Sequence, residues 1–150
     1  MQRELIENII NINAKIEDVC SSINKDKDEI TLVAVSKRKS SELIEIALDN
    51  MINNFGENYA QELHEKAIAI KSSNIVWHFI GPMQSNKVKI IARHAHWIHT
   101  IDREKIIKRL NSECKKLNKI INACIQINIS SEDSKSGCKP EELFELAKLI

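Results

Sequence analysis

The chain alternates between two hydrophobic periodicities. Residues 2–23 predict an amphipathic helix, because their apolar side chains recur at helical spacing. These apolar positions are Leu5, Ile9, Ile12, Ile16, Val19 and Ile23. A charged segment separates this helix from the β-branched run ITLVAVSK at 30–37, which predicts a strand. Ser40 and Ser41 can then cap a second helix that ends near Asn50.

The same alternation continues along the rest of the chain. Further strands are predicted at 54–57, 75–81, 97–102 and 123–130, and further helices at 59–72, 85–94, 103–119 and from Pro140 onward. Short apolar strands that alternate with amphipathic helices favour a parallel sheet covered by helices. No GxGxxG or GxxxxGK[ST] motif follows these strands, which argues against a dinucleotide-binding or P-loop fold.

The predicted fold class is therefore α/β, of the (β/α)8 TIM-barrel type. The pattern contains a leading N-terminal helix and about the first five βα units, whereas a complete barrel has eight. The final helix, EELFELAKLI, stops without a cap or a breaker. We expect residues 1–150 to form a single partial barrel domain, truncated within a helix.

Composition narrows the classes of function. The 22 basic and 21 acidic residues are interleaved and give a net charge of +1, so we expect no nucleic acid and no membrane surface as partner. We identify neither a signal peptide nor a stretch apolar enough to cross a membrane. The 4 cysteines lack CxxC and metal-ligand spacing, which favours reduced thiols in a cytoplasmic protein.

Lys37 is the first candidate for chemistry, because barrels place functional groups at the carboxyl ends of their strands. Alternation puts Val33, Val35 and Lys37 on one face, but both faces are apolar and either can point inward. A desolvated lysine amine is a neutral nucleophile that traps an aldehyde as an imine. Spacing alone favours the alternative, a solvated lysine that ends the strand beside Arg38 and Lys39.

Histidines and amides supply the other candidates. His78 lies within the third strand, either as a satisfied core residue or against an aromatic cofactor. His94, His96 and His99 straddle a helix end and a strand, which favours surface residues over a zinc site, and we assign no metal ligands. The pair of strand amides, Gln126 and Asn128, favours a polar barrel interior. Glycines at 56 and 81 suit tight turns or close backbone approach.

Five segments, in this order, resemble one family. They are AVSK (34–37), FGENYAQE (55–62), WHFIGPMQSNK (77–87), IHTID (98–102) and QINISSEDSKSG (126–137). The set is similar to the YggS/PROSC family of pyridoxal phosphate homeostasis proteins. This resemblance implies the alanine racemase N-terminal barrel, the type III fold of pyridoxal phosphate enzymes. It also implies pyridoxal 5′-phosphate as cofactor, an imine between its aldehyde and Lys37, and pocket-lining roles for Asn58 and His78.

The resemblance further implies a role in intracellular vitamin B6 homeostasis without catalytic activity, so the chain is expected not to be an enzyme. Full-length members of this family are expected to be monomers, and pyridoxal phosphate-dependent apoenzymes are candidate recipients of the cofactor. The chain departs from the family after Lys37, where the usual Thr-Lys-Pro is replaced by Arg38-Lys39-Ser40. Family members also continue through later strands whose loops hold the phosphate.

Two alternatives to this function stay open. One is an amino-acid racemase of the same fold, although racemases of this fold take their second base, a tyrosine, from a separate domain, and Tyr59 is the only tyrosine here. The other is a truncated remnant that cannot retain the cofactor without the phosphate-binding strands. Lys39 and Lys135 also remain as alternative imine sites.

Overall fold

The computed structural model describes residues 2–132 and 134–150. Its strands are β1 (Ala34–Val35), β2 (Asn54–Glu57), β3 (Val76–Phe79), β4 (Trp97–Ile101) and β5 (Asn122–Ile125). Its α-helices are α1 (Gln2–Ser22), α2 (Ser41–Asp49), α3 (Ala60–Ala69), α4 (Val88–His94), α5 (Glu104–Leu117) and α6 (Leu143–Ala147). Short 3-10 helices are η1 (Lys27–Glu29), η2 (Ser85–Lys87) and η3 (Pro140–Glu142).

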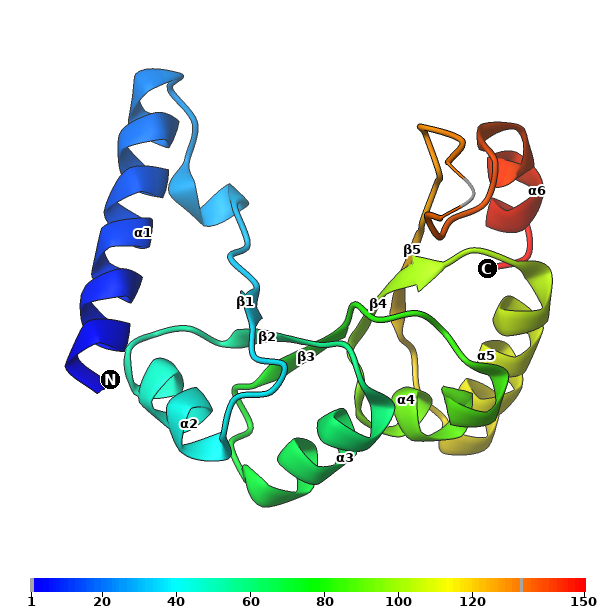
Figure 1. Ribbon diagram of the computed structural model, residues 1–150, viewed down its shortest axis with the longest axis horizontal. Coiled ribbons are helices and arrows are strands. Elements are labelled where there is room, and N and C mark those ends of the chain that lie inside the picture. The colour runs from blue at the N-terminus through cyan, green and yellow to red at the C-terminus, as the bar shows by residue number, and fades with distance from the viewer. Residues whose placement is uncertain (1, 133) are drawn as a thin grey trace.

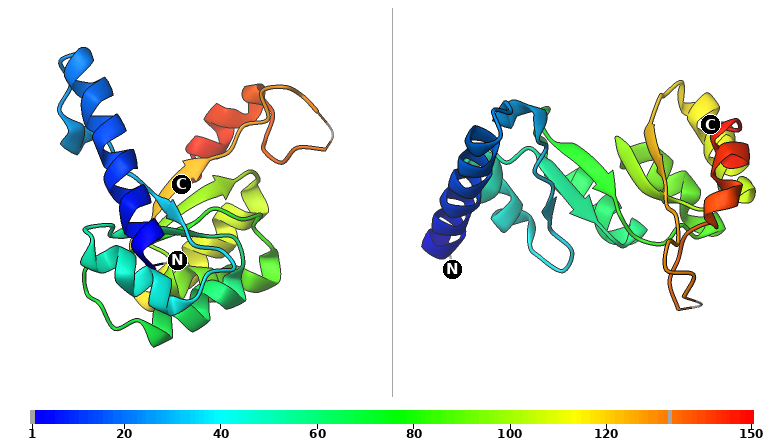
Figure 2. Two further views of the ribbon diagram at one scale, coloured as in Figure 1. Left: turned by 60° about the vertical axis from the view of Figure 1, so that its left-hand side comes forward. Right: turned by 90° about the horizontal axis from the view of Figure 1, so that it is seen from above.

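All strands belong to one parallel sheet in the order β1-β2-β3-β4-β5. Each strand is followed by a helix, so the predicted α/β class with five βα units and a leading helix is confirmed. In Figure 1, α2 to α5 lie along one face of the sheet, α1 rises beside β1, and α6 lies beyond β5. Figure 2 shows the same separation from two other sides, with the strands curving as part of a barrel wall.

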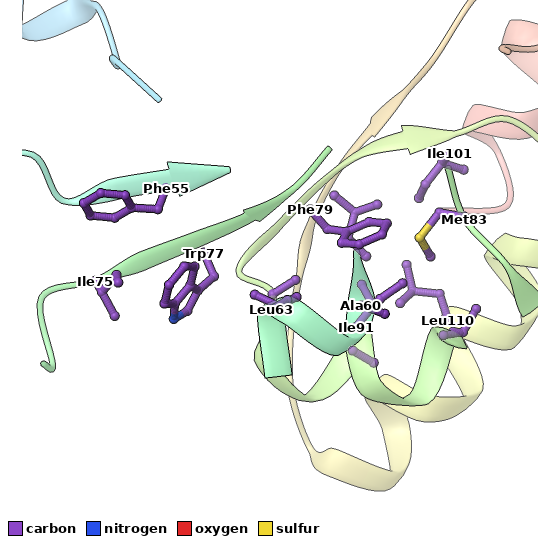
Figure 3. Packing of buried hydrophobic residues seen from close by; sticks show 14 of the residues in the cluster. Phe55, Ala60, Leu63, Ile75, Trp77, Phe79, Met83, Ile91, Ile101 and Leu110 are labelled. Atoms are coloured by element: carbon purple, nitrogen blue, oxygen red, sulfur yellow. The ribbon is translucent and has the colours of Figure 1, made fainter. Parts of the chain in front are cut away.

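The hydrophobic core lies between the sheet and the helices that cover it. Alternate residues of β2 and β3 supply its largest side chains, with the rings of Phe55 and Trp77 6.1 Å apart and Phe79 almost fully buried. Leu63 of α3 and Ile91 of α4 pack beneath them, as Figure 3 shows. Burial of each such side chain contributes about 1.5–3 kcal/mol, so this layer fixes the sheet against the helices.

The two outer strands are shorter than predicted. The ladder of β1 contains only Ala34 and Val35, rather than 30–37, and β5 ends at Ile125 instead of reaching 130. Both are edge strands with a single neighbour, and an apolar run by itself does not supply a partner for backbone pairing. Among the described residues beyond β5, strand-like pairing is limited to an isolated bridge between Ile127 and Cys138.

The helices begin and end close to their predicted limits. The predicted helix at 85–94 starts as a 3-10 turn before it becomes α4, and Ser40 precedes α2 as expected. The hydroxyl of Ser40 nevertheless donates to the Glu42 carboxylate at 3.2 Å rather than accepting a backbone N–H. Among helices of the residues that the structure describes, none is long and apolar enough to cross a membrane.

Candidate functional site

The two faces of the sheet have different neighbours. Phe55 and Trp77 point toward the helices, and the next residue of β2, Gly56, faces the opposite side of the sheet. A Cβ added to Gly56 would meet the side chains of Ile80 at 3.1 Å and Val33 at 3.4 Å. Val33 is therefore on the face turned away from the helices, which resolves the orientation of the first strand that its apolar pattern left open.

Lys37 lies in a tight turn directly after β1. The Lys39 N–H donates to the Ser36 carbonyl at 3.0 Å and closes this turn, in which Arg38 has a left-handed φ of +59°. Ser36 is buried, whereas Lys37 is exposed. The Lys37 side chain is therefore open to solvent.

Asn58 follows β2 and packs against the loop after β3. A Cβ at Gly81 would lie only 1.9 Å from the Asn58 carbonyl oxygen, so this approach requires glycine. Thr100 of β4 then donates its hydroxyl to the Gly81 carbonyl at 2.6 Å. The carboxyl ends of three neighbouring strands are thereby joined, and the predicted close backbone approach at Gly81 is confirmed.

His78 is buried on β3 and both of its ring nitrogens have partners. Its Nε2 is 2.9 Å from the Asn54 Oδ1, and its Nδ1 is 2.9 Å from the His99 Nε2. An amide oxygen only accepts, so Nε2 of His78 donates and Nδ1 accepts from His99. Burial lowers the pKa of His78 to about 4, with smaller contributions from the charges of His99 and His96. The imidazole is therefore neutral near pH 7.

The register of the strands places Lys37 and Asn58 at one height along the strand direction and His78 at a lower one. Val35 pairs with Gly56, and Gly56 pairs with His78. Lys37 and Asn58 each follow this level by two positions, so they come together at the carboxyl edge of the sheet. His78 lies two positions below them, within the sheet.

The other histidines are not one cluster. His94 of α4 pairs with His64 of α3 through ring nitrogens 2.8 Å apart. The Nδ1 of His96 accepts the Trp77 backbone N–H at 2.9 Å, and His99 pairs with His78. Within residues 2–132 and 134–150, no group of three or more His, Cys, Asp or Glu side chains could hold a metal ion.

The side-chain amides of Gln126 and Asn128 donate hydrogen bonds to backbone carbonyls of the segment that follows them. The Gln126 side chain donates to the Ser136 carbonyl at 3.2 Å, and the Asn128 side chain donates to the Glu132 carbonyl at 2.9 Å. Gly137 permits this packing with a φ of +126°, because a Cβ there would lie 2.6 Å from the Asn128 nitrogen. These amides therefore hold the backbone at Glu132 and Ser136 in the segment that follows β5.

A buried ion network lies directly behind the turn that carries Lys37. The Lys66 ammonium of α3 donates to the Glu57 carboxylate at 2.7 Å, the Glu62 carboxylate at 2.7 Å and the Ser36 carbonyl at 2.6 Å. The Ser36 hydroxyl donates to Glu57 at 2.6 Å, and the Arg38 backbone N–H donates to Glu62. Burial raises the pKa of Glu57, opposed by its hydrogen bonds to Lys66 and Ser36.

This network was not predicted from the sequence, although two signals for it exist. Glu57 ends the short run NFGE, where a carboxylate on the same face as Phe55 must be buried. Glu62 and Lys66 are four residues apart on α3, a spacing that brings opposite charges together. Neither signal identifies Ser36 as the partner of Glu57 and Lys66. Ser36 comes close to them only because β1 pairs with β2 in the sheet.

A parallel sheet covered by helices on one face, with a lysine at the carboxyl end of its first strand, defines a class of barrel. The family model described as "Alanine racemase, N-terminal domain" matches residues 10–150, and the chain belongs to this family. The predicted barrel type is thus confirmed.

Curated relatives place the chain more narrowly. It is 46% identical over 141 residues to the pyridoxal phosphate homeostasis protein of Haemophilus influenzae, covering 93% of this chain and 60% of that protein. It is 41% identical over 150 residues to the Escherichia coli K12 protein of the same name, covering 98% of this chain and 64% of that protein. The resemblance to these homeostasis proteins is confirmed, and the chain spans about 60–64% of their length.

Solved structures show the same barrel. PipY of Synechococcus elongatus, determined without PLP, superposes with a TM-score of 0.76 at 28% identity, covering 90% of this chain and 65% of PipY. PipY with PLP bound gives a TM-score of 0.74 over the same shares. A protein from Bifidobacterium adolescentis reaches 0.85 at 21% identity, covering 99% of this chain and 64% of that protein, and shows the fold alone.

Proposed function

We propose that this chain binds pyridoxal 5′-phosphate through an imine to Lys37. The observation that carries the proposal is the exposed Lys37 in an anchored turn at the carboxyl edge of the sheet. Relatives named for pyridoxal phosphate homeostasis, and PipY with PLP bound, support the choice of cofactor.

The residues at this edge fit an aldehyde cofactor. Lys37 would hold the cofactor: its neutral amine would add to the aldehyde carbon with loss of water, giving the imine. Asn58 directly follows the neighbouring strand, as many positions beyond the Val35–Gly56 pair as Lys37, and offers an amide that both donates and accepts. His78 is neutral and buried within β3, and we propose that its ring lines the cofactor site from below.

We further propose a homeostatic role in the cytoplasm, in which the chain holds the cofactor without turning over a substrate. The names of the curated relatives support this role. Pyridoxal phosphate-dependent apoenzymes are the proposed recipients, and the full-length protein is proposed to act as a monomer. A single domain over residues 1–150 remains part of the same proposal.

Borohydride trapping tests the imine. We expect visible absorbance on titration with pyridoxal phosphate and, after reduction and peptide mapping, an adduct on Lys37. Lys37→Arg removes this adduct, whereas the adjacent control Lys39→Arg retains it. An adduct found mainly on Lys39 or Lys135 would contradict the proposal. Equal weak binding of pyridoxal and pyridoxal phosphate would instead indicate a chain that cannot hold the phosphate.

An amino-acid racemisation assay tests the absence of turnover. We expect purified protein, incubated with L-alanine and pyridoxal phosphate, to form D-alanine no faster than the cofactor alone. Tyr59, the one tyrosine of the chain, is half exposed. Tyr59→Phe removes its hydroxyl and tests whether this residue acts as the second base. Robust racemisation that Tyr59→Phe abolishes would establish an enzyme.

A further inference from the structure

The polypeptide on both sides of Lys37 is bound by one buried network. We propose that Lys66, Glu57 and Glu62 are positioning residues that hold the turn 36–39 and thereby select Lys37 as the imine-forming lysine. This inference rests on the proposed function, because it concerns the same lysine. It adds a set of residues that do not contact the cofactor and act through the backbone of the turn.

Lys66 is the centre of this network because all of its donors are used. A lysine ammonium has three N–H groups, and here they reach one backbone carbonyl and two carboxylates at 2.6–2.7 Å. Its side chain is 7% exposed and that of Glu57 is fully buried. Buried charges persist only when they are paired and hydrogen-bonded, so neither group can move without leaving the other uncompensated.

The contacts reach the chain before and after Lys37. Before it, Ser36 is held twice, by its carbonyl to Lys66 and by its hydroxyl to Glu57. After it, the Arg38 N–H is held by Glu62. Arg38 adopts a left-handed φ of +59°, a conformation that non-glycine residues rarely adopt and that these contacts hold in place.

The network therefore holds the backbone of the turn in place and leaves the Lys37 side chain exposed. Lys37 itself has no part in the network and is exposed, as is Lys39 two positions later. Both are lysines open to an aldehyde, so exposure does not distinguish between them. The turn does, because it holds Lys37 two positions beyond the Val35–Gly56 pair, at the carboxyl edge of the sheet. Lys39 instead borders a cavity of about 300 Å³ that α2 also lines.

Two variants test the inference, each with a matched control. Lys66→Met removes the central ammonium. Its control, Lys119→Met, removes a lysine that likewise makes three hydrogen bonds, all of them to backbone carbonyls at the end of α4. Glu62→Ala removes the Arg38 anchor at a partly exposed position, and its control Glu65→Ala changes an exposed glutamate of the same helix. Glu62→Ala keeps the test available where Lys66→Met fails to fold.

The first measurement uses the cofactor-free chain. We expect amide hydrogen exchange at Arg38 to accelerate at least about tenfold in Lys66→Met and Glu62→Ala, and to stay unchanged in both controls. Unchanged exchange in the two network variants would overturn the inference. This measurement is independent of the cofactor, so it also stands if the proposed function fails.

The second measurement is the distribution of borohydride-trapped adducts. We expect the rate of adduct formation on Lys37 to fall by about tenfold or more in both network variants, with a larger share on Lys39. Loss of stability alone does not redistribute adducts, and Lys119→Met provides that comparison. Wild-type distribution in both network variants overturns the inference, whereas a wild-type chain without any Lys37 adduct overturns the proposed function.

Discussion

At the scale of single residues, burial decides the protonation of His78. Its pKa of about 4 lies below the ordinary 6.5, so the unfolded chain binds more protons than the folded chain between these values. The stabilisation from neutral His78 is therefore complete above pH 6.5 and is lost as the pH falls toward 4. Burial lowers the pKa values of His94, His96 and His99 as well, and their contributions have the same sign.

We expect the free energy of unfolding to fall by up to about 3 kcal/mol from His78 alone across this pH range. Urea denaturation at a series of pH values measures the slope, and His78→Gln removes the part that belongs to this residue. Glu57, whose pKa is raised, has the opposite sign and protects the folded state as the pH falls. Equal slopes in wild type and His78→Gln would contradict this assignment.

Gly81 gives a second test at this scale. In Gly81→Ala the new Cβ would overlap the Asn58 backbone, which cannot move as a side chain tip can. We expect a loss of at least about 1–3 kcal/mol in the free energy of unfolding, measured by urea denaturation. The control Gly56→Ala meets only side-chain atoms of Ile80 and Val33 at 3.1–3.6 Å and should cost less. A larger cost for Gly56→Ala would argue against this packing.

At the scale of elements, Lys119 closes the end of a helix to which it does not belong. It follows α5 and donates to the carbonyls of Ala92, Arg93 and Ala95 at 3.0, 3.1 and 2.7 Å. These carbonyls would otherwise be unpaired at the negative end of the α4 dipole. The connection ties α4 to the segment leading into β5.

We expect Lys119→Met to lower the free energy of unfolding by about 1–3 kcal/mol, because it leaves carbonyls without a donor. Thermal and urea denaturation measure the loss. Lys116→Met is the control: this exposed lysine of α5 pairs with Glu113 at the surface, and such pairs contribute about 0–1 kcal/mol. Similar losses in the two variants would show that Lys119 is an ordinary surface lysine.

At the scale of the whole molecule, one layer of side chains joins the sheet to the helices. Ile98 of β4 is completely buried in this layer, whereas Ile120, in the turn before β5, is 95% exposed. A substitution at Ile98 therefore tests packing in the core, whereas a substitution at Ile120 does not. The comparison uses the same residue type at both positions.

Removing one methylene from each isoleucine separates these environments. We expect Ile98→Val to cost about 0.5–1.5 kcal/mol in the free energy of unfolding, and Ile120→Val to change it little. Urea denaturation followed by circular dichroism measures both. A cost at Ile120 as large as at Ile98 would mean that residue 120 is covered.

Local pattern was sufficient for the order of the elements. The change between a period of two and a period near 3.6 depends only on neighbouring residues, and it placed β2 at its observed limits and α1 within one residue of them. The motifs around Lys37, Asn58 and His78 are equally local. The sequence therefore determined the α/β barrel class, and it singled out the lysine on which the proposed function depends.

Only the tertiary structure decided what surrounds that lysine. Ser36 is 21 residues from Glu57 and 30 from Lys66, and parallel pairing of β1 with β2 brings the three together. The same holds for His78, whose partners come from two other strands. Contacts between strands depend on sheet register and on which face meets the helices, and apolar alternation on both faces of β1 specifies neither.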